Sequence, residues 1–169
     1  ALPICEVPRV DGLAKVTGKA VYGDDIIMNN MLYGVCRYVD IPAGRIDALD
    51  LSEAEKVPGV VRIATWNDIP GQRKLGAIVP DHPPIIDKEI AYRGDVVAVV
   101  AAETYEAACI AVDKIKITYN PWEPITSPEE AMKPGARLIH SELDSNIINR
   151  HHTAKGDIDA GFAASSHIF

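Results

Sequence analysis

The amino-acid sequence predicts an α+β fold, with a mixed sheet and two or three helices. Short runs rich in β-branched residues recur between residues 32 and 119, and such runs favour strands. One amphipathic helix, over residues 104–115, lies among them. The strands and helices do not alternate in the regular order that a doubly wound parallel sheet requires. The α+β class therefore fits this order of elements better than the α/β class.

Three strands are predicted in the first half of the chain, over residues 32–39, 45–51 and 59–65. The first has apolar residues at both odd and even positions, which predicts a strand with both faces at least partly covered. Between the second and the third, Ser52 and Glu55 have the spacing of a capping box, which predicts a short helix. Pro58 and Gly59 would end this helix.

The next elements predict the core of the domain. Residues 89–92 and 96–101 flank the turn Arg93-Gly94-Asp95, either as two strands or as one strand with a bulge. The second run is almost entirely apolar, so we expect a buried strand with Val99 in the core. The helix over residues 104–115 follows, with Thr104 as its expected N-cap. Its apolar face predicts that it packs across the sheet.

The remaining elements are shorter. Residues 116–119 alternate as a strand, which Asn120-Pro121 ends because proline has no amide for the ladder. Ser127 and Glu130 have the spacing of a second capping box, and Pro128 occupies the first helical position. This pattern predicts a short helix that Pro134-Gly135 closes. Apolar periodicity weakens from His140 onward, which predicts an extended segment.

Composition excludes several classes of function. With 169 residues, of which 47% are hydrophobic and 24% charged, the chain can form one compact domain, and a disordered or collagen-like chain is excluded. Its longest apolar run is only strand-length, which predicts no membrane span. A net charge of -7 argues against nucleic-acid binding. Cys5, Cys36 and Cys109 form no Cys-x-x-Cys pair, which suits a reducing cytoplasm. No signal peptide is visible, and one could have been removed.

No group of residues predicts a catalytic, cofactor-binding or metal-binding site. The N-terminal glycines spell no phosphate-binding motif. His151 and His152 are adjacent, so they point in different directions, and we expect two exposed loop histidines. Cys36 and Cys109 lie in apolar patterns typical of packing thiols. Arg93-Gly94-Asp95 matches an adhesion motif, but a turn between strands is the simpler interpretation.

A set of aspartates leaves two interpretations open. These residues could supply paired carboxylates for acid–base chemistry or bind a hard cation, although the EF-hand spacing is absent. They could equally be solvated side chains around strand ends. The set comprises Asp24, Asp25, Asp40, Asp47 and Asp50.

An ordered series of segments resembles one protein family. The stretch RVDGLAKVTGKA, which starts at Arg9, and the following YGDDI resemble the opening of the molybdenum-binding subunit of xanthine dehydrogenases and aldehyde oxidoreductases. The segments VPGVV, NDIPG, IAYRG, AVVA and IKITY follow in the family's order, and KGDIDAGF closes the series near Phe162. Two places depart from the family's pattern. Arg37-Tyr38-Val39-Asp40 stands where members usually have Arg-Ser-Pro-His, and Gly94-Asp95-Val96 stands where they have Gly-Gln-Pro.

The resemblance implies an α/β-hammerhead domain that precedes a larger molybdopterin-binding region. We expect an N-terminal arm over residues 1–14, the hammerhead domain over 15–133, and an extended segment over 134–169 that leads to a molybdopterin-binding domain missing from this chain. The implied function is a non-catalytic structural domain, inactive alone, of a molybdenum hydroxylase that oxidises aromatic heterocycles or aldehydes. The alternative is a freestanding hammerhead-fold binding module without enzyme activity.

Cofactors, partners and one possible substrate contact also follow from the resemblance. The parent enzyme is expected to use molybdopterin, with iron–sulfur clusters and usually FAD. The expected partners are the rest of the molybdenum-binding subunit and the iron–sulfur and flavin subunits or domains. In related enzymes, apolar residues in the loop after the NDIPG segment help to line the substrate funnel, and Ala77 and Ile78 correspond to them. The alternative is a surface loop whose Ile78 and Val79 pack on the domain's own core.

Overall fold

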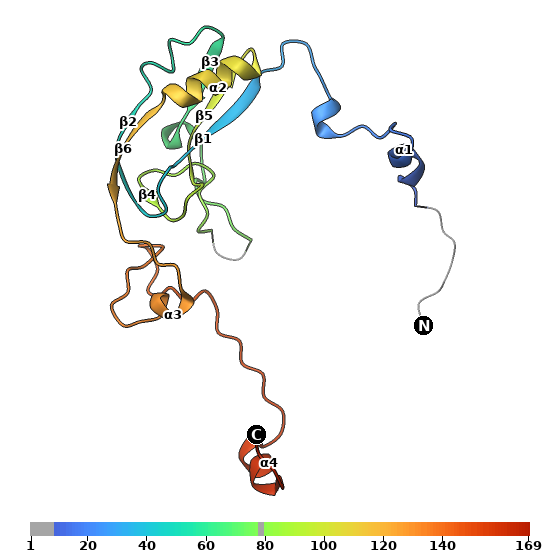
Figure 1. Ribbon diagram of the computed structural model, residues 1–169, viewed down its shortest axis with the longest axis vertical. Coiled ribbons are helices and arrows are strands. Elements are labelled where there is room, and N and C mark those ends of the chain that lie inside the picture. Colours follow the sequence, from blue (N-terminus) through green and yellow to red (C-terminus); the bar gives the residue numbers. More distant parts are fainter. Residues whose placement is uncertain (1–8, 78–79) are drawn as a thin grey trace.

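The computed structural model describes residues 9–77 and 80–169. Six strands form two three-stranded sheets, in the spatial orders β1-β5-β3 and β4-β2-β6 (Figure 1). The strands are β1 Tyr33–Tyr38, β2 Gly44–Asp50, β3 Val60–Ala64, β4 Glu89–Ile90, β5 Val96–Ala102 and β6 Lys116–Pro121. The α-helices are α1 Gly12–Val16, α2 Tyr105–Lys114, α3 Pro128–Ala131 and α4 Ile158–Ala164, and two single 3₁₀ turns are η1 Gly23–Asp25 and η2 Trp66–Asp68.

This arrangement confirms the α+β class. Every strand pair in the described part of the chain is antiparallel, and the strands are divided between two sheets instead of lying in one mixed sheet. Four α-helices are present there, whereas the sequence predicts two or three. The additional helices are α1 and α4, which have 5 and 7 residues. Helices this short cover too few turns to show a clear 3.6-residue period.

The central strand β5 holds the first sheet together. It pairs with β1 on one side and with β3 on the other, so that Val100 faces Val35 across one pair and Ile63 across the other. Val100 is completely buried, together with Ala98 and Ala102 on the same face. Val99 points to the opposite face and is only half-buried, so the expectation that Val99 lies in the core was wrong. Side chains alternate along a strand, and residue type alone does not reveal which set faces the helix.

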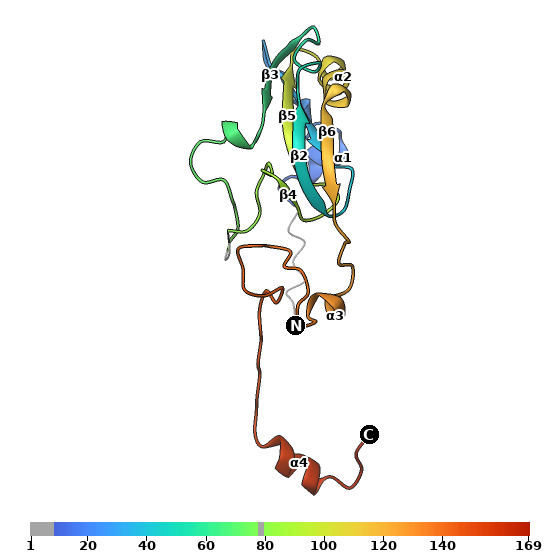
Figure 2. The same ribbon diagram turned by 90° about the vertical axis from the view of Figure 1, so that its left-hand side faces the viewer.

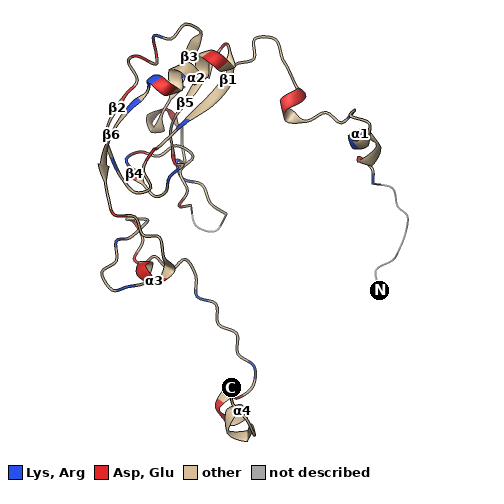
Figure 3. Ribbon diagram, viewed as in Figure 1, with Lys and Arg blue, Asp and Glu red and all other residues tan. Residues whose placement is uncertain are grey.

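Helix α2 covers the Val100 face of this sheet. Its N-cap is Thr104, as predicted, and the Thr104 hydroxyl accepts a hydrogen bond from the Ala107 amide at 3.1 Å. Ala107, Ala108 and Ala111 face the sheet and are buried in the same cluster as Val100. Small side chains on the helix and on β5 allow close packing. Glu106 lies in the first turn of α2 and Lys114 in its last turn, which suits the helix dipole, although Asp113 lies beside Lys114 (Figure 3).

The second sheet forms a separate cluster of buried residues that β5 also joins. This cluster contains Val39, Ile46, Ile86, Ile90 and Val97. β5 therefore contributes Val97 to one core and Val100 to the other. In this sheet β2 and β6 approach closely at Gly44, where a Cβ atom would lie 2.6 Å from the Asn120 carbonyl oxygen. The φ of Gly44 is 154°, so the strand pair requires glycine at this position.

The predicted helix after Ser52 is absent. Residues 52–56 form turns in which the Glu55 amide donates to the Leu51 carbonyl. The Ser52 amide donates instead to the Asp50 carboxylate at 3.0 Å. The capping box fails because Asp50, at the end of β2, takes the donor and starts a turn before a helix can propagate.

Two arms extend from the sheets. The N-terminal arm, residues 9–32, carries α1 and η1, and the C-terminal arm, residues 148–169, carries α4 (Figures 1 and 2). Between β6 and the C-terminal arm lies α3, capped by Ser127 as predicted. Asn146 folds this connecting region back on itself, because its side chain bonds to the Ile139 amide and to the Ala131 and Arg137 carbonyls at 2.8–3.0 Å.

Candidate functional site

A cavity with a volume of about 650 Å³ lies beside the second sheet. Residues 81–83, 86–89, 91 and 92 form one wall and residues 139–142 form another, and the remaining lining residues are Arg45, Trp66, Lys74 and Asp95. Trp66 belongs to η2, on the side of the sheets opposite α2 (Figure 2). A cavity of this volume lies within the range of small-molecule pockets.

Three consecutive residues hold the two walls of this cavity together. The Glu142 carboxylate forms an ion pair with the Lys74 ammonium, which lowers the pKa of Glu142 below its ordinary value. The Ser141 hydroxyl donates to the Glu89 carboxylate at 2.8 Å. His140 Nε2 lies 3.8 Å from the Asp81 carboxylate, a contact that becomes an ion pair when the imidazole is protonated.

The loop that contains the predicted channel residues begins at this cavity. Leu75 and His82 close its neck with two backbone hydrogen bonds of 2.8 and 3.0 Å. Ala77 lies beyond the neck and is exposed. Ile78 and Val79 lie outside the described residues. The neck residues Lys74, Asp81 and His82 line the cavity, and Ala77 is not among its lining residues.

A second polar cluster links the two sheets. The Arg37 guanidinium on β1 donates to the Asp40 carboxylate at 2.7 Å, and this bond lowers the pKa of Asp40. The Tyr119 hydroxyl on β6 accepts a hydrogen bond from the Asp40 amide and donates one to the Asp40 carboxylate, both at 3.1 Å. Burial raises the pKa of Tyr119, so the hydroxyl keeps its proton. This cluster fixes the turn after β1.

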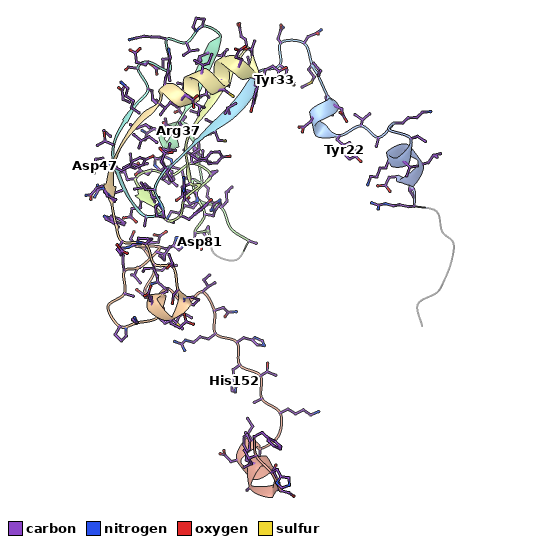
Figure 4. All side chains as sticks on the ribbon, in the orientation of Figure 1. Tyr22, Tyr33, Arg37, Asp47, Asp81 and His152 are labelled. Carbon is purple, nitrogen blue, oxygen red and sulfur yellow. The ribbon has the colours of Figure 1, made fainter. Side chains whose placement is uncertain are left out.

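The five predicted aspartates are not brought together. Asp40 binds Arg37, Asp25 accepts from the Tyr22 amide, and Asp50 accepts from the Ser52 amide. Tyr22 and Asp47 lie in different parts of the molecule (Figure 4). The structure therefore supports solvated or locally bonded carboxylates over a catalytic pair.

The remaining candidates have local roles. His151 and His152 are both exposed on the C-terminal arm, as expected (Figure 4). Asp95 is only 3% exposed and accepts hydrogen bonds from the Ala91 and Tyr92 amides, so the Arg93-Gly94-Asp95 tripeptide is a turn whose carboxylate is enclosed. Among residues 9–77 and 80–169, no group of three or more His, Cys, Asp or Glu side chains could hold a metal ion. We therefore derive no catalytic step from these side chains.

Each of the two arms carries exposed apolar side chains. Val16 is 84% exposed, Ile27 81% and Ile148 93%. Further exposed apolar residues on the arms are Val10, Leu13, Val21, Tyr22, Ile26, Met28, Ile158, Phe162, Ile168 and Phe169. Exposed apolar patches of this kind mark interaction surfaces or ligand-binding sites. No helix in the described part of the chain is both long and apolar enough to cross a membrane.

These features define a class of domain: a small α+β unit with two cores, no catalytic cluster among the described residues, and two apolar arms. Residues 17–123 match the family described as "Aldehyde oxidase and xanthine dehydrogenase, a/b hammerhead domain". The chain belongs to this hammerhead-domain family, which confirms the resemblance drawn from the sequence.

Three known proteins illustrate the similarity. A probable xanthine dehydrogenase subunit of Bacillus subtilis (strain 168) is 38% identical, with 95% of this chain and 21% of the relative covered. The nicotinate dehydrogenase large molybdopterin subunit of Eubacterium barkeri is 37% identical over 91% of this chain and 36% of the relative. The fold also matches a crystal structure of a Cu,Mo-CO dehydrogenase, with a TM-score of 0.81 and 25% sequence identity. The match covers 96% of this chain and 22% of that chain. The chain thus spans only about a fifth to a third of the length of these proteins.

Sequence reasoning missed the two polar clusters. Lys74 and Glu142 are 68 residues apart, and Asp40 and Tyr119 are 79 apart. No local pattern predicts such pairs. The departure from the family's Arg-Ser-Pro-His segment was the one available signal, since it places Asp40 three residues after the retained Arg37.

Proposed function

We propose that this chain is the non-catalytic hammerhead portion of a molybdenum-containing hydroxylase that oxidises aromatic heterocycles or aldehydes. The family match over residues 17–123 carries this proposal. Relatives named for xanthine and nicotinate dehydrogenation, the second a molybdopterin subunit, support a heterocyclic substrate. Within this enzyme, molybdopterin would supply the redox chemistry, and the side chains described here would contribute shape and binding surfaces.

The proposed role of the domain is to brace the cofactor-binding parts of the enzyme. Both arms carry exposed apolar side chains. Their burial against another part of the enzyme would be favourable, because each aliphatic side chain that is fully buried contributes roughly 1.5–3 kcal/mol of free energy. The partners we propose are the rest of the molybdenum-binding subunit and the iron–sulfur and flavin subunits or domains. FAD, the iron–sulfur clusters and a cytoplasmic location belong to this proposal.

We also propose the division predicted from the sequence: an N-terminal segment over residues 1–14, which overlaps the first part of the arm described above, a hammerhead domain over 15–133 and a connecting segment over 134–169. The six strands and α2 all lie within the second range, which supports it. That Ala77 and Ile78 line the substrate channel stays a prediction. Ala77 is exposed and therefore accessible, which is compatible with this role.

Elemental analysis and a substrate panel test this function. The complete polypeptide that carries this chain, purified without an affinity tag, is expected to contain molybdenum and to oxidise a purine, another N-heterocycle or an aromatic aldehyde. The 169-residue chain alone, as the matched control, is expected to do neither. Stoichiometric metal or oxidation by the isolated chain would contradict a non-catalytic role. A complete polypeptide that oxidises no member of the panel would instead favour the freestanding binding module.

A further inference from the structure

Residues 140–142 make three separate side-chain contacts across the cavity. Glu142 pairs with Lys74 and His140 lies beside Asp81, so the contacts reach both sides of the loop neck. Ser141 donates to Glu89 at the start of β4. We call residues 140–142 the strap.

The strap is itself held in place. The Leu143 amide donates to the His140 carbonyl at 3.0 Å, which makes the strap part of a turn. The Asn146 side chain accepts from the Ile139 amide at 2.8 Å, directly before the strap. The same side chain donates to the Ala131 carbonyl at the end of α3. The strap therefore connects the α3 region to the loop neck through a continuous series of polar contacts.

The described residues of the loop have little apolar packing to fix their position. Its neck is closed by the two backbone bonds between Leu75 and His82. Leu75 is 53% exposed, and neither buried cluster includes any of the described residues 73–77 and 80–82. The position of the neck therefore depends on polar contacts to a neighbouring segment.

We propose that the strap positions the neck of the 75–82 loop and thereby sets the size of substrate that the parent enzyme admits, with Lys74, Asp81, His140 and Glu142 as positioning residues. This inference rests on the proposed function, in which Ala77, two residues beyond the neck residue Leu75, lines the substrate channel. The contacting side chains are only about one-third to two-fifths exposed. Solvent therefore screens the attraction between their charges less than it would for fully exposed pairs. None of these residues is assigned a role in the chemistry.

Hydrogen exchange tests the strap without requiring activity. In the complete polypeptide, Glu142→Gln is expected to speed amide exchange in the peptides that span 74–83 and 138–147 by about two- to fivefold, the range for a partly exposed ion pair. The double variant Lys74→Glu with Glu142→Lys should restore slow exchange. The matched control is Glu53→Gln, which removes the Glu53–Lys56 ion pair on a distant turn. Unchanged exchange in Glu142→Gln, or equal acceleration by Glu53→Gln, would overturn the inference.

Kinetics of the same variants test the consequence for substrates. In Glu142→Gln, KM for bulky substrates is expected to change at least about threefold, with kcat and the KM for small substrates unchanged, and the charge-reversed pair should reverse this. Faster exchange with identical KM values across the size series would refute the positioning role. If the unaltered polypeptide oxidised no substrate, the proposed function would fail, and the exchange result alone would decide whether the strap holds the loop.

Discussion

Replacement of Val100 by alanine tests how the two faces of β5 are assigned. Val100 is completely buried between β1, β3 and α2, and the substitution removes two methyl groups. Each buried methyl is worth about 0.8 kcal/mol of transfer free energy. A cavity of about 50 Å³ adds roughly 1 kcal/mol if the core does not collapse. We expect the free energy of unfolding to fall by about 2–3 kcal/mol.

Urea denaturation followed by far-UV circular dichroism measures this change. Val99→Ala, at a half-buried position on the opposite face of the same strand, should cost roughly 1 kcal/mol, since less apolar surface is lost. Val61→Ala on β3 is the surface control, because Val61 is 56% exposed and a change within about 0.5 kcal/mol is expected. If Val99→Ala cost more than Val100→Ala, the assignment of the faces would be refuted.

Three further predictions concern the second sheet, the Asp40 cluster and the loop. Gly44→Ala should destabilise the protein by more than about 2 kcal/mol in the same assay, because its Cβ would lie 2.6 Å from the Asn120 carbonyl oxygen. Wild-type stability in that variant would mean that β2 and β6 are further apart than described. The pKa of Asp40 is lower in the folded state than its ordinary value, so its contribution is present near neutral pH and is lost as the pH falls through the folded pKa. Asp40→Asn should therefore flatten the acid limb of stability measured between about pH 5 and pH 2, and an unaltered limb would argue against the Arg37–Asp40 pair. Ile78→Trp in the complete enzyme should raise KM for bulky substrates and spare small ones, whereas equal kinetics across a size series would remove this position from the channel.

Local features of the sequence determined most of the secondary structure. The runs that predicted β1, β2, β3, β5 and β6 needed only side-chain alternation and β-branched composition. Thr104 and Ser127 cap α2 and α3 as predicted, because a cap depends on residues within one turn. The ordered motifs also identified the family, since they are contiguous and keep their order.

Only the tertiary structure decided how these elements combine. The division into two sheets and the placement of Val100, instead of Val99, in the core depend on which strands pair and on the face that α2 covers. Ser52 shows that a nearby competitor, Asp50, can cancel a correct local signal. The strap and the Arg37–Asp40–Tyr119 cluster join residues separated by 68 and 79 positions in the chain. Such contacts form only when the fold brings distant segments together, so no pattern within a single element of the sequence can reveal them.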